Sequence, residues 1–284
     1  MSHLIRYILF LLTLSIADPA SAAPEKEIIF AISPMASPVS TVSSFSDFID
    51  YLSKKTGMKV VLKQRRKYSD INSLLKSGEA QFAYTCTGAY LSGRKEFGLE
   101  VLAVPVINGR TTYNSYIIVN KNGNIKSFDQ LKGKVFAFTD PLSLSGRIYP
   151  AYLLETMNTT EGKFFRKTFY TSSHEKSVES VAYGLADGAA VDSLIFDDMK
   201  RMKDPATAVV NIIQISPPYG IPPIVVSPGT DKAIKQIMLS SLLKMKDDPA
   251  GMKILEALHI EKFVLPDPAI YYSSVQLRQA AQMP

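Results

Sequence analysis

The stretch Lys134–Arg147 (KVFAFTDPLSLSGR) decides the fold class, because it passes from an apolar strand directly into the start of a helix. Residues 134–140 have the pattern of a buried strand, and the turn that follows is rich in serine. The same change of pattern occurs early in the chain, where the strand Glu27–Ile32 is followed by a helix over residues 42–56 that stops at Gly57. Strands that alternate with crossover helices predict an α/β architecture with mostly parallel sheets flanked by helices.

Two α/β units follow one another along the chain, and this predicts two lobes. We expect residues 23–110 to form the first part of lobe 1 and residues 111–221 to form lobe 2. Residues 222–284 contain a Pro-rich turn, a short apolar run and helices, so we expect the chain to return to lobe 1 and complete it. Crossings near residues 110–116 and 216–222 then leave a cleft between the lobes, where small molecules commonly bind.

The first 22 residues have the three-part pattern of a secretory signal peptide. A short cationic start contains Arg6, an apolar run covers Tyr7–Ile16, and Ala20–Ala22 supplies the small residues that signal peptidase needs. The apolar run is too short for a permanent membrane span, although a buried N-terminal helix is an alternative. No cysteine follows it that could carry a lipid anchor. We therefore expect cleavage after Ala22 and an exported, soluble, periplasmic protein.

The composition narrows the classes of function. The 284 residues include 32 Lys and Arg against 26 Asp and Glu, a formal net charge of +6, which favours anionic ligands but is no nucleic-acid signature. Cys86 is the only cysteine and there are three histidines, so the sequence excludes a disulfide framework and disfavours a metal site rich in Cys or His. The sequence also lacks a phosphate-binding loop with its lysine, a nucleophile elbow and an HExxH motif. We expect no cofactor and no metal.

Two strand-to-helix turns carry side chains that suit an oxyanion. Ser143 and Ser145 lie in the first turn, and His174 begins the helix after the second, within TSSHE. Free backbone N–H groups, hydroxyls and the positive end of a helix dipole meet at such turns. A simpler interpretation is that the serines cap their helices, and Ser172 and Glu175 have the spacing of a capping box.

Longer segments around these turns resemble the phosphate/phosphite/phosphonate-binding proteins of ABC importers. LKGKVFAFTDPLSLSGRIYP, followed by TSSHEKSVESVAYGLADGAAVD, is similar to the lobe-two pattern of that family. RKYSDINSLLKSGEAQFAYTCTGAY and TTYNSYIIVN resemble its lobe-one helix and its first crossing strand. The similarity runs from about Glu27 to Tyr272. It implies a two-lobed periplasmic-binding-protein fold, type II-like, and an extracytoplasmic solute-binding protein that captures phosphate, phosphite or a phosphonate between its lobes for an ABC importer.

The resemblance also implies binding roles at the positions that match. Ser143, Ser145 and His174 match the donors that family members aim at phosphorus-bound oxygens. Tyr68 and Tyr113 match tyrosines contributed by the first lobe and by the first crossing. All five are therefore candidate ligand-binding residues.

Two further candidates are less clearly assigned. Leu144 stands where the family has Thr, which removes one hydroxyl donor from the turn. Leu144 either faces an organic substituent of the ligand or packs into the core of the second lobe. Asp192 is a candidate partner for the amine of an aminoalkylphosphonate or for the proton of a monoprotonated oxyanion, or it caps the next helix.

The expected partners are a small oxyanion and, transiently, a membrane-embedded ABC permease; we expect a monomer and no nucleic acid. Two alternatives remain open. One is a sensory protein that presents its ligand to a membrane receptor. The other is an exported phosphoryl-transfer or hydrolytic enzyme, which is disfavoured because the motifs found give no paired carboxylates, metal cluster or base-linked nucleophile.

Overall fold

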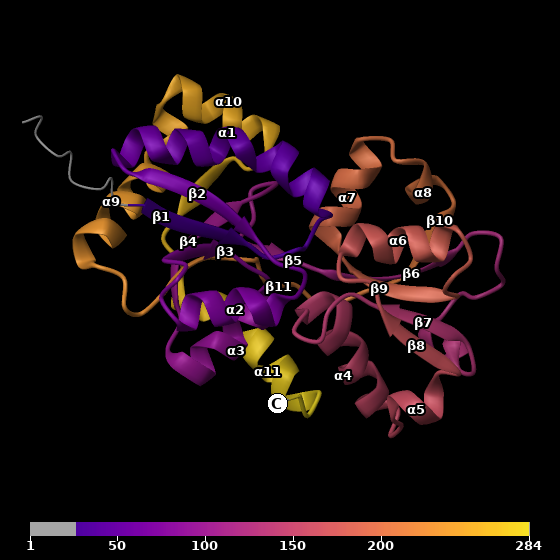
Figure 1. Cartoon of the computed structure of the whole chain (residues 1–284). Coiled ribbons are helices and arrows are strands. Elements are labelled where there is room, and N and C mark those ends of the chain that lie inside the picture. Colours follow the sequence, from indigo (N-terminus) through magenta and orange to yellow (C-terminus); the bar gives the residue numbers. More distant parts are fainter. Residues whose placement is uncertain (1–26, 284) are drawn as a thin grey trace, which may run out of the picture.

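Apolar runs from the beginning and the end of the chain form one sheet in the structure, a computed structural model that describes residues 27–283 (Figure 1). Its six strands are β1 (Glu27–Ile32), β2 (Lys59–Gln64), β3 (Phe82–Tyr84), β4 (Glu100–Val106), β12 (Ile224–Val226) and β13 (Lys262–Val264). Their order is β13-β4-β12-β3-β1-β2. β1 is parallel to β2 and β3, whereas β12 lies antiparallel between β3 and β4.

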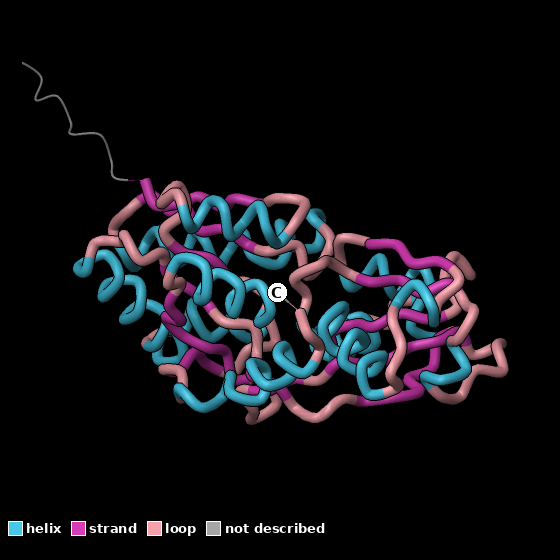
Figure 2. Tube along the Cα trace, turned by 90° about the horizontal axis from the view of Figure 1, so that it is seen from below, coloured by secondary structure: helices cyan, strands magenta, loops and turns pink. Residues whose placement is uncertain are grey.

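The middle of the chain forms a second sheet. Its five strands are β6 (Ser115–Asn120), β7 (Val135–Phe138), β8 (Lys167–Tyr170), β9 (Gly188–Asp192) and β10 (Val210–Ile215). Their order is β10-β6-β9-β7-β8, in which β7 is parallel to β8 and β9 while β6 is antiparallel to β9 and β10. The two sheets lie side by side along the long axis of the molecule (Figures 1 and 2).

Both sheets share one arrangement of five strands, to which the first sheet adds β13 antiparallel to β4, and it corrects one detail of the sequence prediction. The strand that follows a crossing enters antiparallel in each lobe, β12 between β3 and β4 and β6 between β9 and β10. The two-lobed α/β fold is confirmed, but the sheets are mixed rather than mostly parallel, because each incorporates a strand that arrives from the other lobe. The crossings themselves pair as a short antiparallel ribbon of β5 (Thr112–Tyr113) and β11 (Tyr219–Gly220).

Helices cover both faces of each sheet (Figure 1). Around the first sheet these are α1 (Pro38–Thr56), α2 (Tyr68–Lys76), α3 (Thr87–Phe97), α9 (Lys232–Leu243), η3 (Met245–Asp247) and α10 (Pro249–Ala257). Around the second they are η1 (Phe128–Leu131), η2 (Leu144–Ile148), α4 (Tyr149–Thr156), α5 (Glu161–Phe164), α6 (His174–Ala182), α7 (Ser193–Arg201) and α8 (Pro205–Ala208). The chain ends with η4 (Pro268–Tyr271) and α11 (Tyr272–Ala280), which contacts α3 on one side and α4 on the other.

The first helix starts earlier than the sequence pattern predicts. α1 begins at Pro38 rather than at residue 42, because Ser37 caps it by accepting a hydrogen bond from the Ser40 N–H and proline suits the first helical turn. Within residues 27–283 no helix is long and apolar enough to cross a membrane. The predicted signal peptide, residues 1–22, lies outside the described residues.

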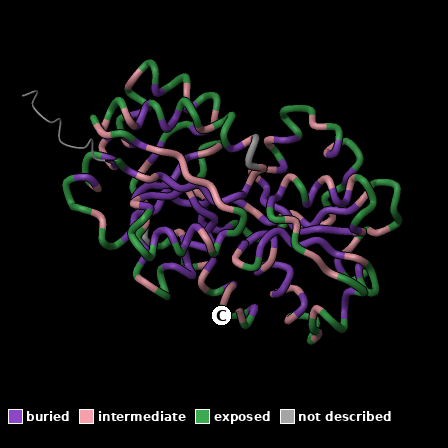
Figure 3. The backbone as a smooth tube through the Cα atoms, viewed as in Figure 1, coloured by how far each residue is buried: buried purple, intermediate pink, exposed green. Residues whose placement is uncertain are grey.

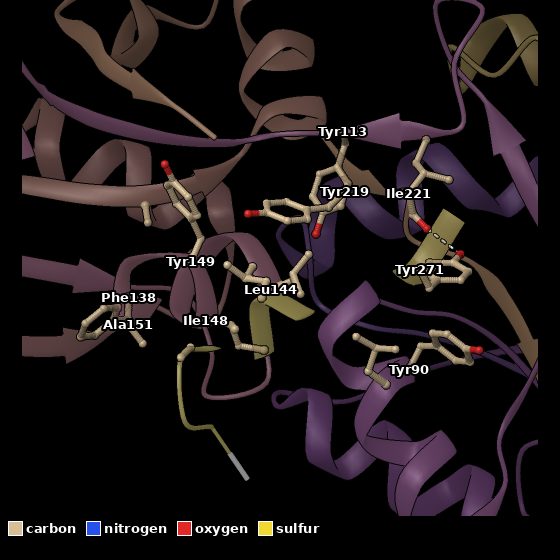
Figure 4. Packing of buried hydrophobic residues seen from close by; sticks show 14 of the residues in the cluster. Tyr90, Tyr113, Phe138, Leu144, Ile148, Tyr149, Ala151, Tyr219, Ile221 and Tyr271 are labelled. Atoms are coloured by element: carbon tan, nitrogen blue, oxygen red, sulfur yellow. Dashed lines mark hydrogen bonds between the residues drawn. The ribbon is translucent and has the colours of Figure 1, made fainter. Parts of the chain in front are cut away.

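One buried hydrophobic cluster joins the two lobes. It includes Tyr90 and Leu91 of α3, Leu144 and Ile148 of η2, and Tyr219 of the crossing ribbon (Figure 4). Figure 3 shows buried segments that run through both sheets and across the region between them. The strand ends that carry the candidate residues therefore meet in an interior shared by both lobes.

Candidate functional site

His174 is the first residue of α6, and its ring is fixed in one tautomer. The backbone N–H of Asp192 donates to His174 Nδ1 over 3.1 Å, and Thr139 Oγ1 lies 3.0 Å from the same nitrogen. A backbone N–H only donates, so Nδ1 is unprotonated and the neutral ring carries its proton on Nε2. Nε2 is buried and has no hydrogen-bond partner among residues 27–283. Burial lowers the pKa of His174 to about 3, so the side chain presents a neutral N–H donor at pH 7.

The two serines of the first turn have different roles. Ser143 Oγ accepts a hydrogen bond from the Gly146 N–H over 3.0 Å and caps η2, as the simpler interpretation of this serine had it. Ser145 Oγ is buried without a partner, although the Ser145 carbonyl accepts a 2.7 Å bond from Ser115 Oγ. Of the two serines, Ser145 is the one whose hydroxyl has no partner of ideal geometry within residues 27–283, and it lies beside the Tyr113 phenol.

The two tyrosines come from the first lobe and the crossing. Tyr68 begins α2, Tyr113 lies on β5, and both phenol oxygens are buried without a hydrogen-bond partner. Burial raises the pKa of each phenol well above its ordinary value, so both remain protonated donors. The hydroxyls of Thr87 and Ser145 lie near the Tyr113 phenol and oppose that rise.

Four unpartnered donors thus come from both lobes and the crossing, on Tyr68, Tyr113, Ser145 and His174. Buried polar atoms are nearly always hydrogen-bonded in proteins, and each one left unpaired costs about 1–3 kcal/mol. Short contacts tie the elements that carry these donors. Ser115 links the Ser145 turn to β9, because it bonds to Ser145 and stands opposite Asp192 in the β6–β9 pairing. Such a set of donors suits a ligand with several acceptor oxygens.

The remaining two candidates have structural contacts of their own. Asp192 Oδ1 accepts a 2.8 Å bond from the Leu194 N–H and caps α7, and burial raises the pKa of this carboxyl to about 7. The Leu144 side chain is fully buried in the hydrophobic cluster between the lobes, together with Ile148 and Tyr219 (Figure 4). The structure therefore favours a packing role for the Leu144 side chain, in the cluster between the lobes, over contact with a ligand substituent. It also shows that Asp192 caps the helix that follows it.

A pocket of about 270 Å³ is lined by residues of both lobes, among them Asp192, whose backbone N–H donates to His174 Nδ1. The first lobe contributes Met35, Phe45 and Tyr84 to its lining, and the second contributes Ile195 as well as Asp192. Apolar side chains make up much of the lining, and Asp192, Asp197, Asp198 and Arg201 add charged groups to it.

Contacts between the lobes hold this arrangement together. The backbone N–H of His174 donates to the Met35 carbonyl over 3.0 Å, and the backbone N–H of Ser37 donates to Glu175 Oε2 over 2.9 Å. The capping-box interpretation of Ser172 and Glu175 was wrong. Ser173 caps α6, Ser172 has a left-handed backbone with φ of 71°, and Glu175 is turned toward the other lobe.

Sequence reasoning missed several residues that shape the site. Thr139 contacts the His174 ring, Ser115 binds the Ser145 carbonyl, and Asp140 accepts a bond from the Tyr68 N–H. Thr139 and Asp140 directly follow strand β7, just before the serine turn, and that position was the available signal. Over residues 27–283, no group of three or more His, Cys, Asp or Glu side chains is placed to hold a metal ion.

Comparison with solved structures shows the same fold. A binding protein component of an ABC phosphonate transporter from Pseudomonas aeruginosa superposes with a TM-score of 0.86, at 23% identity over 91% of this chain and 87% of that one. PhnD1 from Prochlorococcus marinus in complex with methylphosphonate gives 0.82, at 18% identity over 91% of this chain and 99% of that one.

Sequence comparison points to the same family. The chain is 24% identical to the phosphonates-binding periplasmic protein of Escherichia coli K12, over 86% of this chain and 74% of that protein. It is 26% identical to a probable ABC transporter phosphite-binding protein of Prochlorococcus marinus, over 54% of this chain and 55% of that protein, little more than half its length. Residues 30–271 match the family described as "ABC transporter, phosphonate, periplasmic substrate-binding protein". The chain therefore belongs to the periplasmic substrate-binding proteins of phosphonate ABC transporters, which confirms the predicted family and two-lobed fold.

Proposed function

We propose that this protein captures a phosphorus oxyanion between its lobes and presents it to an ABC permease. The observation that carries the proposal is that four of the buried donors without a partner among residues 27–283 lie on Tyr68, Tyr113, Ser145 and His174, residues that the family resemblance singled out. A tetrahedral oxyanion has enough acceptor oxygens for all of them, and hydrogen bonds to a charged acceptor are the stronger kind. The relatives named for phosphite, phosphonates and methylphosphonate support the same ligand class.

The adjoining pocket favours a phosphonate with a small substituent over bare phosphate. A volume of about 270 Å³ is more than the phosphorus group itself needs, and the lining combines apolar side chains with Asp192, Asp197, Asp198 and Arg201. Asp192 in this lining would face either an amine on that substituent or a proton on the oxyanion. We propose that Asp192 and the backbone of Leu144 also contribute to the binding site. Ser143 supports the site by capping the turn that carries Ser145.

Calorimetric titration with phosphate, phosphite, methylphosphonate and 2-aminoethylphosphonate tests the proposal. We expect at least one of the four to bind with 1:1 stoichiometry, and His174→Ala to weaken that binding about tenfold to a hundredfold, the value of one hydrogen bond to a charged group. Failure of all four ligands to bind the wild-type protein, or wild-type affinity in His174→Ala, would refute it.

The remaining features of the proposal follow from the family. Its members are solute-binding transport proteins found outside the cytoplasm. We propose that this chain acts without catalysis, as a monomer, after cleavage of residues 1–22. We also propose that residues 23–110 together with 222–284 move as one lobe against residues 111–221, since the two sheets divide the described strands in this way. Recovery of the ligand unchanged after incubation tests the absence of catalysis.

A further inference from the structure

Helix α2 lacks a cap from its own segment. Its N-cap residue is Lys67, whose side chain makes no capping hydrogen bond. The first N–H groups of a helix have no partner within the helix, so a buried helix start needs an acceptor from elsewhere. Tyr68, the first residue of α2, is fully buried and carries one of the four donors of the proposed site.

The missing cap comes from the other lobe. Asp140 Oδ2 accepts a 3.2 Å hydrogen bond from the Tyr68 N–H, and Asp140 follows strand β7 of the second sheet. The second oxygen, Oδ1, accepts a 2.8 Å bond from the Leu142 N–H, and the Asp140 carbonyl accepts one of 3.0 Å from the Ser143 N–H. One residue therefore orders the turn that leads to Ser145 and holds the helix that carries Tyr68.

The bond between Asp140 and the Tyr68 N–H depends on the arrangement of the lobes, because it joins one lobe to the other. Asp140 is only 3% exposed, and its two side-chain bonds go to backbone N–H groups, one of them across the interface. If the lobes separate, the bond to Tyr68 breaks while the bond to Leu142 stays within its own turn. The interaction is thus made only when the lobes are together, and it favours that state over the open one.

We propose that Asp140 is a positioning residue, which caps α2 across the cleft and thereby couples closure of the lobes to placement of the Tyr68 hydroxyl in the binding site. This inference rests on the proposed function, because it assigns Asp140 a role in holding the same oxyanion. Asp140 itself does not touch the ligand. Its effect reaches the ligand through the backbone of Tyr68.

The test compares Asp140→Ala and Asp140→Asn with the wild-type protein, using methylphosphonate, phosphite and inorganic phosphate as probes. Loss of a charged bond that forms only on closure should weaken affinity about tenfold or more and accelerate ligand dissociation. Asp140→Asn keeps the shape of the side chain, so it remains informative if Asp140→Ala fails to fold. Asp204→Ala is the matched control, because Asp204 caps its own helix α8 through the Ala206 N–H, within one lobe. It should lower the melting temperature without changing affinity.

A double-mutant cycle separates positioning from general stabilisation. If Asp140 acts through Tyr68, its replacement should cost less affinity in a Tyr68→Phe background, where the hydroxyl to be positioned is gone. Wild-type affinity in both Asp140 variants, or fully additive losses in the cycle, would overturn the inference while leaving the proposed function intact. Failure of the wild-type protein to bind any of the three probes would instead overturn the proposed function, and this inference with it.

Discussion

Replacing Gly88 by alanine should block closure of the lobes while leaving each lobe folded. Gly88 lies in the first turn of α3, in the first lobe, where it faces the backbone of the serine turn in the second. A Cβ at this position would lie 2.1 Å from the Leu142 carbonyl oxygen and 2.9 Å from the Leu144 nitrogen. Real Cβ atoms essentially never approach closer than 3.0 Å, and neither neighbour is a flexible side chain. The turn must therefore move away by about 0.9 Å at this point.

Gly88→Ala should weaken ligand binding without lowering the stability of the open protein. A hydrogen bond of 2.9 Å that lengthens by about 0.9 Å is effectively lost, so a ligand would keep its contacts to only one lobe. Loss of one or more charged hydrogen bonds predicts an affinity at least about tenfold to a hundredfold weaker. Within the helix, alanine is favoured over glycine by about 0.5–1 kcal/mol, so the ligand-free protein should be as stable as the wild type or more stable.

Calorimetry, thermal unfolding and small-angle scattering together check this prediction. We expect Gly88→Ala to show weak binding, an undiminished melting temperature without ligand, and a smaller ligand-induced decrease in the radius of gyration. Gly93→Ala is the matched control in the same helix, because a Cβ there would meet the side-chain ends of Leu99 and Phe97 in its own lobe. It should alter stability but not affinity. Wild-type affinity together with full compaction in Gly88→Ala would refute the reasoning.

Three further predictions follow from the contacts at the site. Ser145→Ala should weaken oxyanion binding about tenfold to a hundredfold by calorimetry, whereas Ser143→Ala should mainly lower the melting temperature, by the cost of a helix cap, about 1 kcal/mol; equal affinities in the two variants would contradict the assignment. Leu144→Thr should destabilise the protein by about 2 kcal/mol in denaturant unfolding and leave the ranking of ligands unchanged, because it buries a hydroxyl in an apolar cluster; an unchanged midpoint would argue that the side chain faces a polar site. The pKa of His174 is lowered to about 3, so the folded protein loses stability as the pH falls below about 6.5; the pKa of Asp192 is raised to about 7, so the folded protein loses stability as the pH rises from about 4. The two effects oppose each other between about pH 4 and 6.5, so Asp192→Asn should make the melting temperature rise more steeply with pH in this range than in the wild type. Parallel profiles of the two proteins would contradict this.

The sequence was sufficient for the architecture because periodicity and turn chemistry are local. The alternation around Lys134–Arg147 predicted the α/β lobes, and the structure places His174 and Ser145 at strand-to-helix turns, as the sequence predicted. Strand direction was less accessible. Nothing local in Ser115–Asn120 shows that this strand will enter its sheet antiparallel, because that depends on the path of the chain between lobes.

Contacts that cross between the lobes could not be predicted for the same reason. The bond from the Tyr68 N–H to Asp140 joins residues 72 positions apart, and that from Ser37 to Glu175 joins residues 138 apart. Glu175 illustrates the difficulty, because its spacing from Ser172 satisfied a local capping rule that the folded protein does not use. Which serine of the first turn is a cap and which is a donor likewise depended on the π-helical geometry of residues 144–148.

In the proposed site, four neutral donors would hold the anion. Tyr68, Tyr113, Ser145 and His174 are all neutral at pH 7, because burial raises the pKa of the two phenols and lowers that of the imidazole. Neutral donors cost less to bury than a lysine or arginine would, so closure of the proposed site is opposed less than it would be by a buried cation. The formal charge of +6 can then favour encounter with anions through long-range attraction, while the buried donors select by geometry. Salt should accordingly slow association far more than it accelerates dissociation, since only the first step depends on exposed charge.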